Sequence, residues 1–326
     1  MMLLSVIVPC YNEESVLRAT HERLTEVLRQ MTGFDYELIY VNDGSADKTQ
    51  AILHHLHLLD PHVRVLLLSR NFGHQIAVTA GLEAAAGDAI IIIDADLQDP
   101  PEVIPEMISL WREGNDVVYG MRIERRGESR FKLWTAKLFY RLINYLSETK
   151  MPLDTGDFRL IDRKVVEVIK MMPERARFLR GMVSWAGFRQ TSLPYERAAR
   201  HAGESKYPLA KMIRFAMDGI ISFSLVPLKL AIWTGFMAMG IAVAGIIVAV
   251  VDHFLASGLV RGWASLFVAV LFMGGVQLVS LGIIGEYLGR IYTEVKRRPL
   301  YVVQERLGFV DEDAAVITSR EVNAVV

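Results

Sequence analysis

A run of four isoleucines, Ile90 to Ile93, ends abruptly in Asp94-Ala95-Asp96. β-Branched side chains pack well on a pleated surface, so this run predicts a buried strand. Acidic residues directly after a strand lie at the edge where open α/β sheets bind ligands. Alternate residues of an extended segment point the same way, so Asp94 and Asp96 can share one cation. Hard carboxylate oxygens suit Mg²⁺ or Mn²⁺, and such an ion usually has an anionic partner.

Strand and helix patterns alternate along residues 2–125. The predicted strands are Leu3 to Pro9, Tyr36 to Val41, Val63 to Ser69, Ala89 to Ile93 and Asp116 to Gly120. The predicted helices are Glu13 to Met31, Thr49 to Leu59, Gln75 to Ala86 and Val103 to Arg112. This alternation predicts a mostly parallel, doubly wound sheet. Right-handed crossovers then bring Asn12, Asp43, Asn71 and Asp94 to one edge of it.

Two long runs, residues 230–251 and 263–285, carry no charge. Each is long enough to cross about 30 Å of hydrocarbon as a helix, so we predict two transmembrane helices. Lysines and arginines precede the first run and follow the second, whereas the connecting loop, residues 252–262, holds only Arg261. The positive-inside rule therefore predicts that both termini are cytoplasmic. The stretch ahead of the first run, residues 206–226, has the pattern of an amphipathic helix in the membrane interface.

Composition excludes several other classes of protein. The formal net charge of -1 argues against a binder of nucleic acid or another polyanion. The single cysteine, Cys10, excludes an intramolecular disulfide and a cysteine-rich metal site. His54, His55 and His57 fall on one short helix without a carboxylate at ligand spacing, which indicates a solvated face. The sequence has no Gly-x-x-x-x-Gly-Lys-Ser/Thr phosphate loop, and its start, Met-Met-Leu-Leu, does not resemble a signal peptide.

Four strand-end blocks together resemble a known family. They are Pro9-Cys10-Tyr11-Asn12-Glu13-Glu14, Val41-Asn42-Asp43-Gly44-Ser45, Ser69-Arg70-Asn71-Phe72-Gly73 and Asp94-Ala95-Asp96-Leu97-Gln98-Asp99. In this order and spacing they resemble a family 2 glycosyltransferase with the GT-A fold. With the two apolar runs, the chain is similar to polyprenyl-phosphate glycosyltransferases of the dolichyl-phosphate mannose synthase type, especially the bactoprenol glucosyltransferases. The resemblance covers roughly residues 3–300 and implies an α/β, Rossmann-like GT-A domain followed by interfacial and transmembrane helices.

The resemblance implies a site for the donor. Its metal residues match Asp94, Asp96 and Gln98, around Mg²⁺ or Mn²⁺. Its nucleotide-sugar residues match Pro9, Tyr11, Glu13, Asp43 and Asp94. An aromatic ring can stack on a base, and carboxylates can accept hydrogen bonds from uracil or ribose. Helix capping is the alternative, because Asp43 or Ser45 could cap the helix near Lys48 and Asn12 could cap the helix that follows it. An Asx turn could explain the aspartate pair. A turn explains residues 70–73 nearly as well as nucleotide contact does.

The block Asp154-Thr155-Gly156-Asp157-Phe158-Arg159-Leu160 resembles the family segment that carries the catalytic base, and Asp157 is the matching residue. A phosphate acceptor is largely ionised at neutral pH, so Asp157 is expected chiefly to accept the last proton and fix geometry. The alternative is a structural pair with Arg159, with Asp154 as the second candidate base. Cations grouped near the predicted membrane side would bind the acceptor phosphate: Arg122, Arg126, Arg130, Lys132, Arg200, Ser205 (as a hydrogen-bond donor) and Lys206.

The sequence thus predicts five regions. They are a cytoplasmic GT-A domain (1–205), an interfacial amphipathic region (206–229), two transmembrane helices (230–251 and 263–285) and a cytoplasmic tail (286–326). Glycines in both runs allow helix contacts and hence a homo-oligomer.

The predicted reaction is inverting transfer of a hexose, glucose from UDP-glucose in the first instance, to undecaprenyl or another polyprenyl phosphate at the bilayer. GDP-mannose, UDP-N-acetylglucosamine, a galactose donor and an aminoarabinose donor stay open as alternatives. A processive polysaccharide synthase fits less well, because such enzymes have more spans and a Gln-x-x-Arg-Trp motif, which this sequence does not contain. A non-catalytic scaffold or transporter subunit is the third hypothesis, opposed by the intact aspartates.

Overall fold

The structure is a computed structural model that describes residues 2–122, 155–196, 226–255 and 263–309. Within these residues one eight-stranded sheet has the strand order β7-β5-β6-β4-β1-β2-β3-β8. The strands are β1 (Met2–Cys10), β2 (Phe34–Asn42), β3 (Val63–Leu68), β4 (Ala89–Ile92), β5 (Val117–Arg122), β6 (Thr155–Asp162), β7 (Gln190–Tyr195) and β8 (Val303–Leu307). Only β6 and β8 run against the others, so the prediction of a mostly parallel sheet is confirmed.

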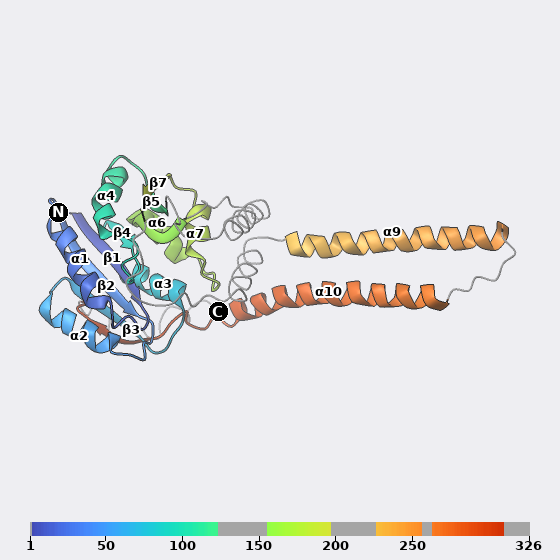
Figure 1. Cartoon of the computed structure of the whole chain (residues 1–326), viewed down its shortest axis with the longest axis horizontal. Coiled ribbons are helices and arrows are strands. Elements are labelled where there is room, and N and C mark those ends of the chain that lie inside the picture. The colour runs from blue at the N-terminus through green and yellow to red at the C-terminus, as the bar shows by residue number, and fades with distance from the viewer. Residues whose placement is uncertain (1, 123–154, 197–225, 256–262, 310–326) are drawn as a thin grey trace, which may run out of the picture.

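Helices cover both faces of this sheet (Figure 1). They are α1 (Leu17–Arg29), α2 (Thr49–Leu59), α3 (His74–Ala84), a 3-10 turn η1 (Pro101–Val103), α4 (Ile104–Arg112), α6 (Arg163–Met171) and α7 (Leu179–Trp185). Val6 and Val8 of β1 belong to the core under α1, α2 and α4. The intervening Ile7 belongs to the second core, under α3, α6 and α7. Apolar side chains on both faces explain why β1 and β4 read as continuous hydrophobic runs.

The first helix is shorter than its apolar spacing predicted, because it begins at Leu17 and not at Glu13. The residues before it form a loop in which Asn12 adopts a left-handed conformation, with φ of 57°. The backbone N–H of Glu13 donates to Thr49 Oγ1 at 2.9 Å, which ties this loop to the start of α2. The loop therefore belongs to the strand-end edge of the sheet.

The segment after the second apolar run returns to the sheet, although no pattern in its sequence predicts this. Strand β8 pairs antiparallel with the edge strand β3, and the N–H of Ser69 donates to the carbonyl of Val302 at 2.9 Å. Its sequence, Val-Gln-Glu-Arg-Leu, alternates half-buried and exposed residues, so it has no apolar run that would predict a strand. Residues 303–307 thus add a strand to the sheet, although they lie in the region that the sequence analysis described as a tail.

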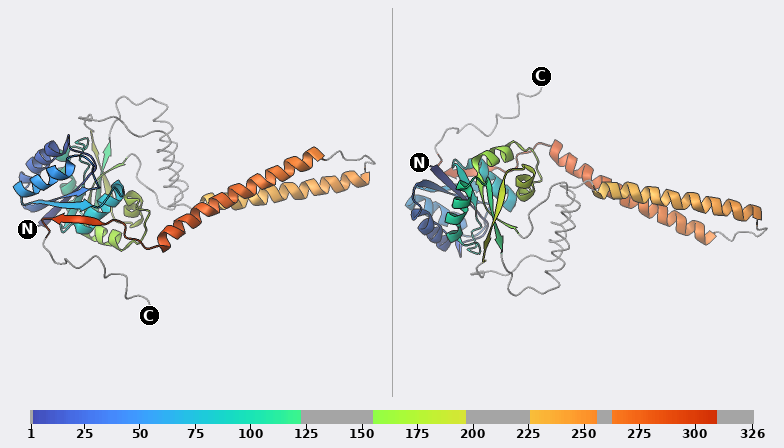
Figure 2. Two further views of the ribbon diagram at one scale, coloured as in Figure 1. Left: turned by 90° about the horizontal axis from the view of Figure 1, so that it is seen from below. Right: turned by 90° about the horizontal axis from the view of Figure 1, so that it is seen from above.

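Each apolar run forms a continuous helix, α9 (Val226–Leu255) or α10 (Trp263–Val295). The two helices lie side by side and project away from the α/β domain (Figures 1 and 2). Among the described residues, Phe272–Val295 has the length and composition needed to cross a bilayer, and Ala231–Gly245 is a shorter apolar helix. The prediction of two transmembrane helices therefore stays a prediction.

Candidate active site

The loops after β1 and β2 are joined by side-chain hydrogen bonds at the carboxyl-terminal edge of the sheet. The N–H of Asn12 donates to Ser45 Oγ at 2.9 Å, and Asn12 Oδ1 accepts from the N–H of Ala46 at 2.8 Å. Tyr11, on the same loop, is 49% exposed. Three predicted nucleotide-binding residues, Pro9, Tyr11 and Glu13, therefore lie at the rim that the sequence indicated, on β1 and the loop that follows it.

Asp43 lies at the end of β2 and holds the loop ahead of α3. Its two carboxylate oxygens accept the backbone N–H groups of Phe72 and Gly73, at 2.7 and 2.9 Å. Burial raises the pKa of Asp43, and these two hydrogen bonds oppose that rise. The alternative that Asp43 or Ser45 caps α2 is wrong, because the N–H of Thr49 donates to Asp47 Oδ1 at 3.0 Å.

Gly44 allows the loops after β2 and β3 to pack against each other. Its φ is 65°, and an added Cβ would lie 2.4 Å from the carbonyl carbon of Arg70. We expect Gly44→Ala to lower the free energy of unfolding by about 2–3 kcal/mol. Gly114→Ala is the matched control, because Gly114 has a φ of 92° but open space around it. Denaturant titration of both variants checks this, and equal losses would contradict a steric role for Gly44.

Asp94 and Asp96 follow β4 on the same edge. The side chain of Asp94 is 30% exposed, and Asp96 Oδ1 accepts the N–H of Gln98 at 3.1 Å. Burial raises the pKa of Asp94 to about 6, although the neighbouring His74 opposes the rise. The third predicted ligand, Gln98, is buried, with 8% of its surface exposed.

Within the described residues, no three His, Cys, Asp or Glu side chains are gathered as a metal site. Mg²⁺ sites commonly use one or two carboxylates together with substrate phosphates and water. The donor chemistry of Asp94 and Asp96, two hard carboxylates after one strand, fits such a cation.

Asp157 lies on β6, the strand next to β4, and its carboxylate contacts three elements. Arg180 of α7 donates through Nε to Oδ1 at 2.8 Å, and Gln75 of α3 donates through Nε2 to Oδ2 at 3.3 Å. His74 Nε2 lies 3.3 Å from the same Oδ2, and Arg159 Nη2 lies 3.9 Å from Oδ1. Burial alone would raise the pKa of Asp157, but His74 and Arg180 hold it well below its usual range. Asp157 is therefore ionised at neutral pH.

His74 connects the aspartate pair with Asp157. Its Nε2 lies 3.7 Å from Asp94 Oδ1 and 3.3 Å from Asp157 Oδ2. Burial would lower the pKa of His74, but the hydrogen bond to Asp157 and the charge of Asp94 raise it to about 9. The structure thus brings the predicted metal residue Asp94 and the predicted base Asp157 within 4 Å of the same ring nitrogen, His74 Nε2. The pairing of Asp157 with Arg159, considered as an alternative, is present but longer than the Arg180 contact.

Of the residues predicted to bind the acceptor phosphate, Arg122 alone lies within the described ranges. Arg122 is the last residue of β5. The other members lie outside the described residues, as does Asp154: Arg126, Arg130, Lys132, Arg200, Ser205 and Lys206.

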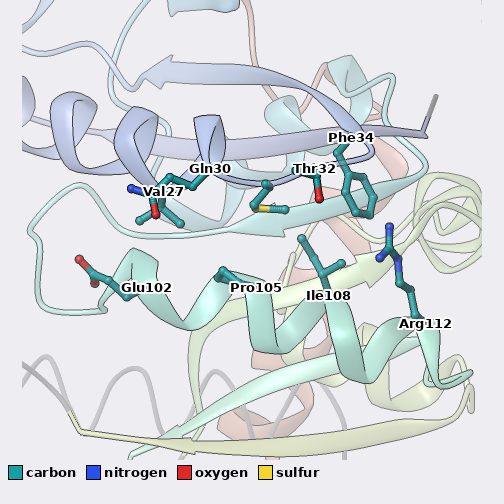
Figure 3. Close-up of a pocket in the computed structure, with 9 residues that line it drawn as sticks. Val27, Gln30, Thr32, Phe34, Glu102, Pro105, Ile108 and Arg112 are labelled. Carbon is teal, nitrogen blue, oxygen red and sulfur yellow. The ribbon is translucent and has the colours of Figure 1, made fainter.

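A cavity of about 430 Å³ lies elsewhere, between α1 and α4 (Figure 3). The Arg112 guanidinium lies over the Phe34 ring there, 4.5 Å from its centroid, and Val27 and Ile108 add apolar surface. None of the predicted site residues lines this cavity, so we place the candidate active site at the strand-end edge.

Comparison with known proteins identifies the family of this chain. Residues 5–170 match glycosyl transferase family 2. An uncharacterized glycosyltransferase of Bacillus subtilis, YkcC, is 51% identical over 93% of this chain and 94% of its own. The chain belongs to glycosyl transferase family 2. The present chain is also 42% identical to the SfII prophage-derived bactoprenol glucosyl transferase of Shigella flexneri, over 93% of its own length and 98% of the Shigella protein. The family and the sheet topology confirm the predicted GT-A fold.

Solved structures resemble the glycosyltransferase more distantly. One is the glucosyl-3-phosphoglycerate synthase of Mycobacterium tuberculosis, in complex with Mn²⁺, UDP-glucose and phosphoglyceric acid. It is 20% identical, with a TM-score of 0.45, and covers 68% of this chain and 78% of that one.

Sequence reasoning missed His74, Gln75 and Arg180. His74 and Gln75 directly follow the block at residues 69–73, so the strand-end position was a signal that could have found them. Arg180 has no comparable signal, because it lies on a short helix whose sequence, Leu-Arg-Gly-Met-Val-Ser-Trp, carries one charge and no recognisable motif.

Proposed function

We propose that this protein is a membrane-bound, inverting polyprenyl-phosphate glycosyltransferase. The donor is a hexose nucleotide, UDP-glucose in the first instance, and the acceptor is the phosphate of undecaprenyl or another polyprenyl phosphate. The observation that carries this proposal is the near full-length similarity to bactoprenol glucosyl transferases, at 42% identity. That similarity extends beyond the family 2 region, which ends at residue 170, into the two long apolar helices.

The donor nucleotide would lie across the ends of β1, β2 and β4. The exposed ring of Tyr11 would stack on the base, and Glu13 would accept hydrogen bonds from uracil or ribose. Asp43 is buried and accepts two backbone N–H groups, so it would shape the nucleotide site by holding residues 72–73. Pro9, on β1, would form part of the floor.

Asp94 and Asp96, with Gln98 beside them, would hold Mg²⁺ or Mn²⁺. A divalent cation there would offset charge on the donor phosphates and on the departing UDP. The fit rests on the two carboxylates after β4 and on the partial exposure of Asp94.

Asp157 would act on the acceptor. In the proposed reaction a phosphate oxygen of the lipid attacks the anomeric carbon from the face opposite UDP, forming one C–O bond while the bond to UDP breaks. A carboxylate with a lowered pKa is a weak base, and a phosphate acceptor needs little deprotonation. Asp157 is therefore proposed chiefly to orient the acceptor and the cations around it, with Arg122 and the six predicted residues outside the described ranges binding the acceptor phosphate.

Membrane attachment is the remaining part of the proposal. We propose that α9 and α10 both span the bilayer, with the catalytic domain and both termini cytoplasmic. This follows from the lysines and arginines that flank the two apolar runs. Glu294, near the end of α10, accepts the N–H of Arg175 at 2.8 Å, so the helix is anchored to the catalytic domain.

A transfer assay tests the function. Membranes containing the protein are incubated with undecaprenyl phosphate and radiolabelled UDP-glucose, GDP-mannose or UDP-N-acetylglucosamine. We expect label from UDP-glucose to enter the organic phase as a lipid-linked monosaccharide. Label in polymer would indicate a polysaccharide synthase, label from another donor would correct the sugar, and no transfer from any donor would contradict the proposed activity.

A further inference from the structure

Both oxygens of the Asp157 carboxylate are held by side chains from other elements. Arg180 of α7 donates to Oδ1 at 2.8 Å, and Gln75 and His74 of α3 both contact Oδ2 at 3.3 Å. A carboxylate has several lone-pair directions, so two donors on different sides restrict how it can rotate. The orientation of Asp157 is thus set by α3 and α7 as well as by its own strand.

Gln75 uses both ends of its amide. While Nε2 donates to Asp157, Oε1 accepts the backbone N–H of Leu179 at 3.1 Å. Leu179 is the first residue of α7 and directly precedes Arg180. One side chain therefore fixes Asp157 directly and also fixes the start of the helix that presents Arg180 to it.

The position of Gln75 is set in turn from the donor side of the site. The N–H groups of Phe72 and Gly73 donate to Asp43, and the carbonyl of Gly73 accepts from Ile76 and Ala77 at 3.0 Å. The first turn of α3 is therefore anchored to the end of β2. Hydrogen bonds and the backbone of this turn therefore connect Asp43 with Gln75, whose side chain donates to Asp157.

We propose that Gln75 is a positioning residue for glycosyl transfer, which sets the orientation of the Asp157 carboxylate and the place of Arg180 beside it. This inference rests on the proposed function of Asp157. Its physical basis is that a displacement of about 1 Å in a reacting group can cost about 10²-fold in rate. The Gln75 amide contacts Asp157 and α7 but no predicted nucleotide residue. Its loss is therefore expected to lower kcat and to leave substrate affinity unchanged.

Two substitutions separate this role from a purely structural one. In Gln75→Glu, an oxygen can still accept the N–H of Leu179, so the start of α7 stays capped. The donor to Asp157 is replaced by a negative charge, which repels the carboxylate. In Gln75→Leu both bonds are lost. We expect kcat for transfer to undecaprenyl phosphate to fall about 10²-fold in both variants, with KM for undecaprenyl phosphate and UDP affinity unchanged.

Gln50→Leu is the matched control, because Gln50 is the second residue of α2 as Gln75 is of α3, and both side chains are half-buried. It is expected to keep the wild-type kcat. If Gln75→Glu kept the wild-type kcat, the role of Gln75 would be limited to accepting the N–H of Leu179 at the start of α7. That result would overturn the proposal. A raised KM for undecaprenyl phosphate with unchanged kcat would also overturn it, since it would place Gln75 in acceptor binding.

A crystal structure of Gln75→Leu keeps this inference distinct from the proposed function. If the wild type transfers no sugar from UDP-glucose, GDP-mannose or UDP-N-acetylglucosamine, the proposed function fails. The crystal structure of the variant still tests whether Gln75 positions the Asp157 carboxylate. We expect the start of α7 to shift and the contact between Arg180 and Asp157 to lengthen, with the Asp157 carboxylate turned from its wild-type orientation, while the backbone of β6 stays in place. A variant in which the Asp157 side chain and its contact with Arg180 keep their wild-type geometry would overturn the positioning role.

Discussion

Asp157→Asn is expected to lower kcat for glycosyl transfer by about 10²–10⁴-fold while sparing UDP affinity. The substitution keeps the size of the side chain but removes the charge that Arg180 and His74 contact at 2.8 and 3.3 Å. An amide neither accepts the last acceptor proton nor balances these two cations. Single-turnover transfer from UDP-glucose to undecaprenyl phosphate measures the loss, and calorimetry measures UDP binding.

Asp162→Asn provides the control on the same strand. Asp162 Oδ1 accepts the N–H of Lys164 at 2.9 Å and thereby caps α6, and its Oδ2 accepts from Trp111 Nε1 at 2.7 Å. Asparagine can still cap α6 through its one oxygen but no longer accepts from Trp111, so this variant is expected to lose about 1–3 kcal/mol of stability and to keep wild-type kcat. If Asp157→Asn retained full activity, Asp157 would have no part in the mechanism.

The central sheet was predictable because its strands are local and apolar. The isoleucines of β4 and the valines of β1 lie in the core on both faces, so their sequences show the strands without any knowledge of the neighbours. Strand β8 was not predictable in this way, because it pairs only along one edge with β3 and has half-buried side chains. Its pairing depends on a contact about 240 residues away along the chain, which no local pattern encodes.

The residues of the candidate site likewise fall into those that the sequence predicts and those that it does not. Asp43, Asp94 and Asp96 follow strands, and topology alone brings strand ends to one edge. His74, Gln75 and Arg180 contact Asp157 because of the way in which α3 and α7 pack over β6. Sequence spacing does not report such packing, so Arg180, which lies closer to Asp157 than the Arg159 named from the sequence, could not be identified before the structure.

Asp94→Ala is expected to abolish metal-dependent UDP binding and to lower transfer by about 10³-fold or more. The reason is that a cation offsetting charge on the departing UDP supplies several kcal/mol, and each 1.36 kcal/mol is tenfold in rate. Removing one of the two carboxylates after β4 leaves Asp96 as the only aspartate of the pair. Chelation with EDTA should reduce the activity of the wild type to a similar level, and Mn²⁺ or Mg²⁺ should restore it. Calorimetric titration of Mn²⁺ with UDP present measures the site without reference to turnover.

Asp88→Ala is the control for this prediction, because Asp88 immediately precedes the same strand at its opposite end. Its exposed carboxylate accepts the N–H of Leu3 at 2.9 Å, away from the strand ends that would bind the nucleotide. This variant should titrate Mn²⁺ as the wild type does. Activity that survives EDTA in the wild type, together with unchanged UDP binding by Asp94→Ala, would contradict a metal role. The charge on the departing UDP would then have to be balanced by protein cations alone, such as His74, whose Nε2 lies 3.7 Å from Asp94 Oδ1.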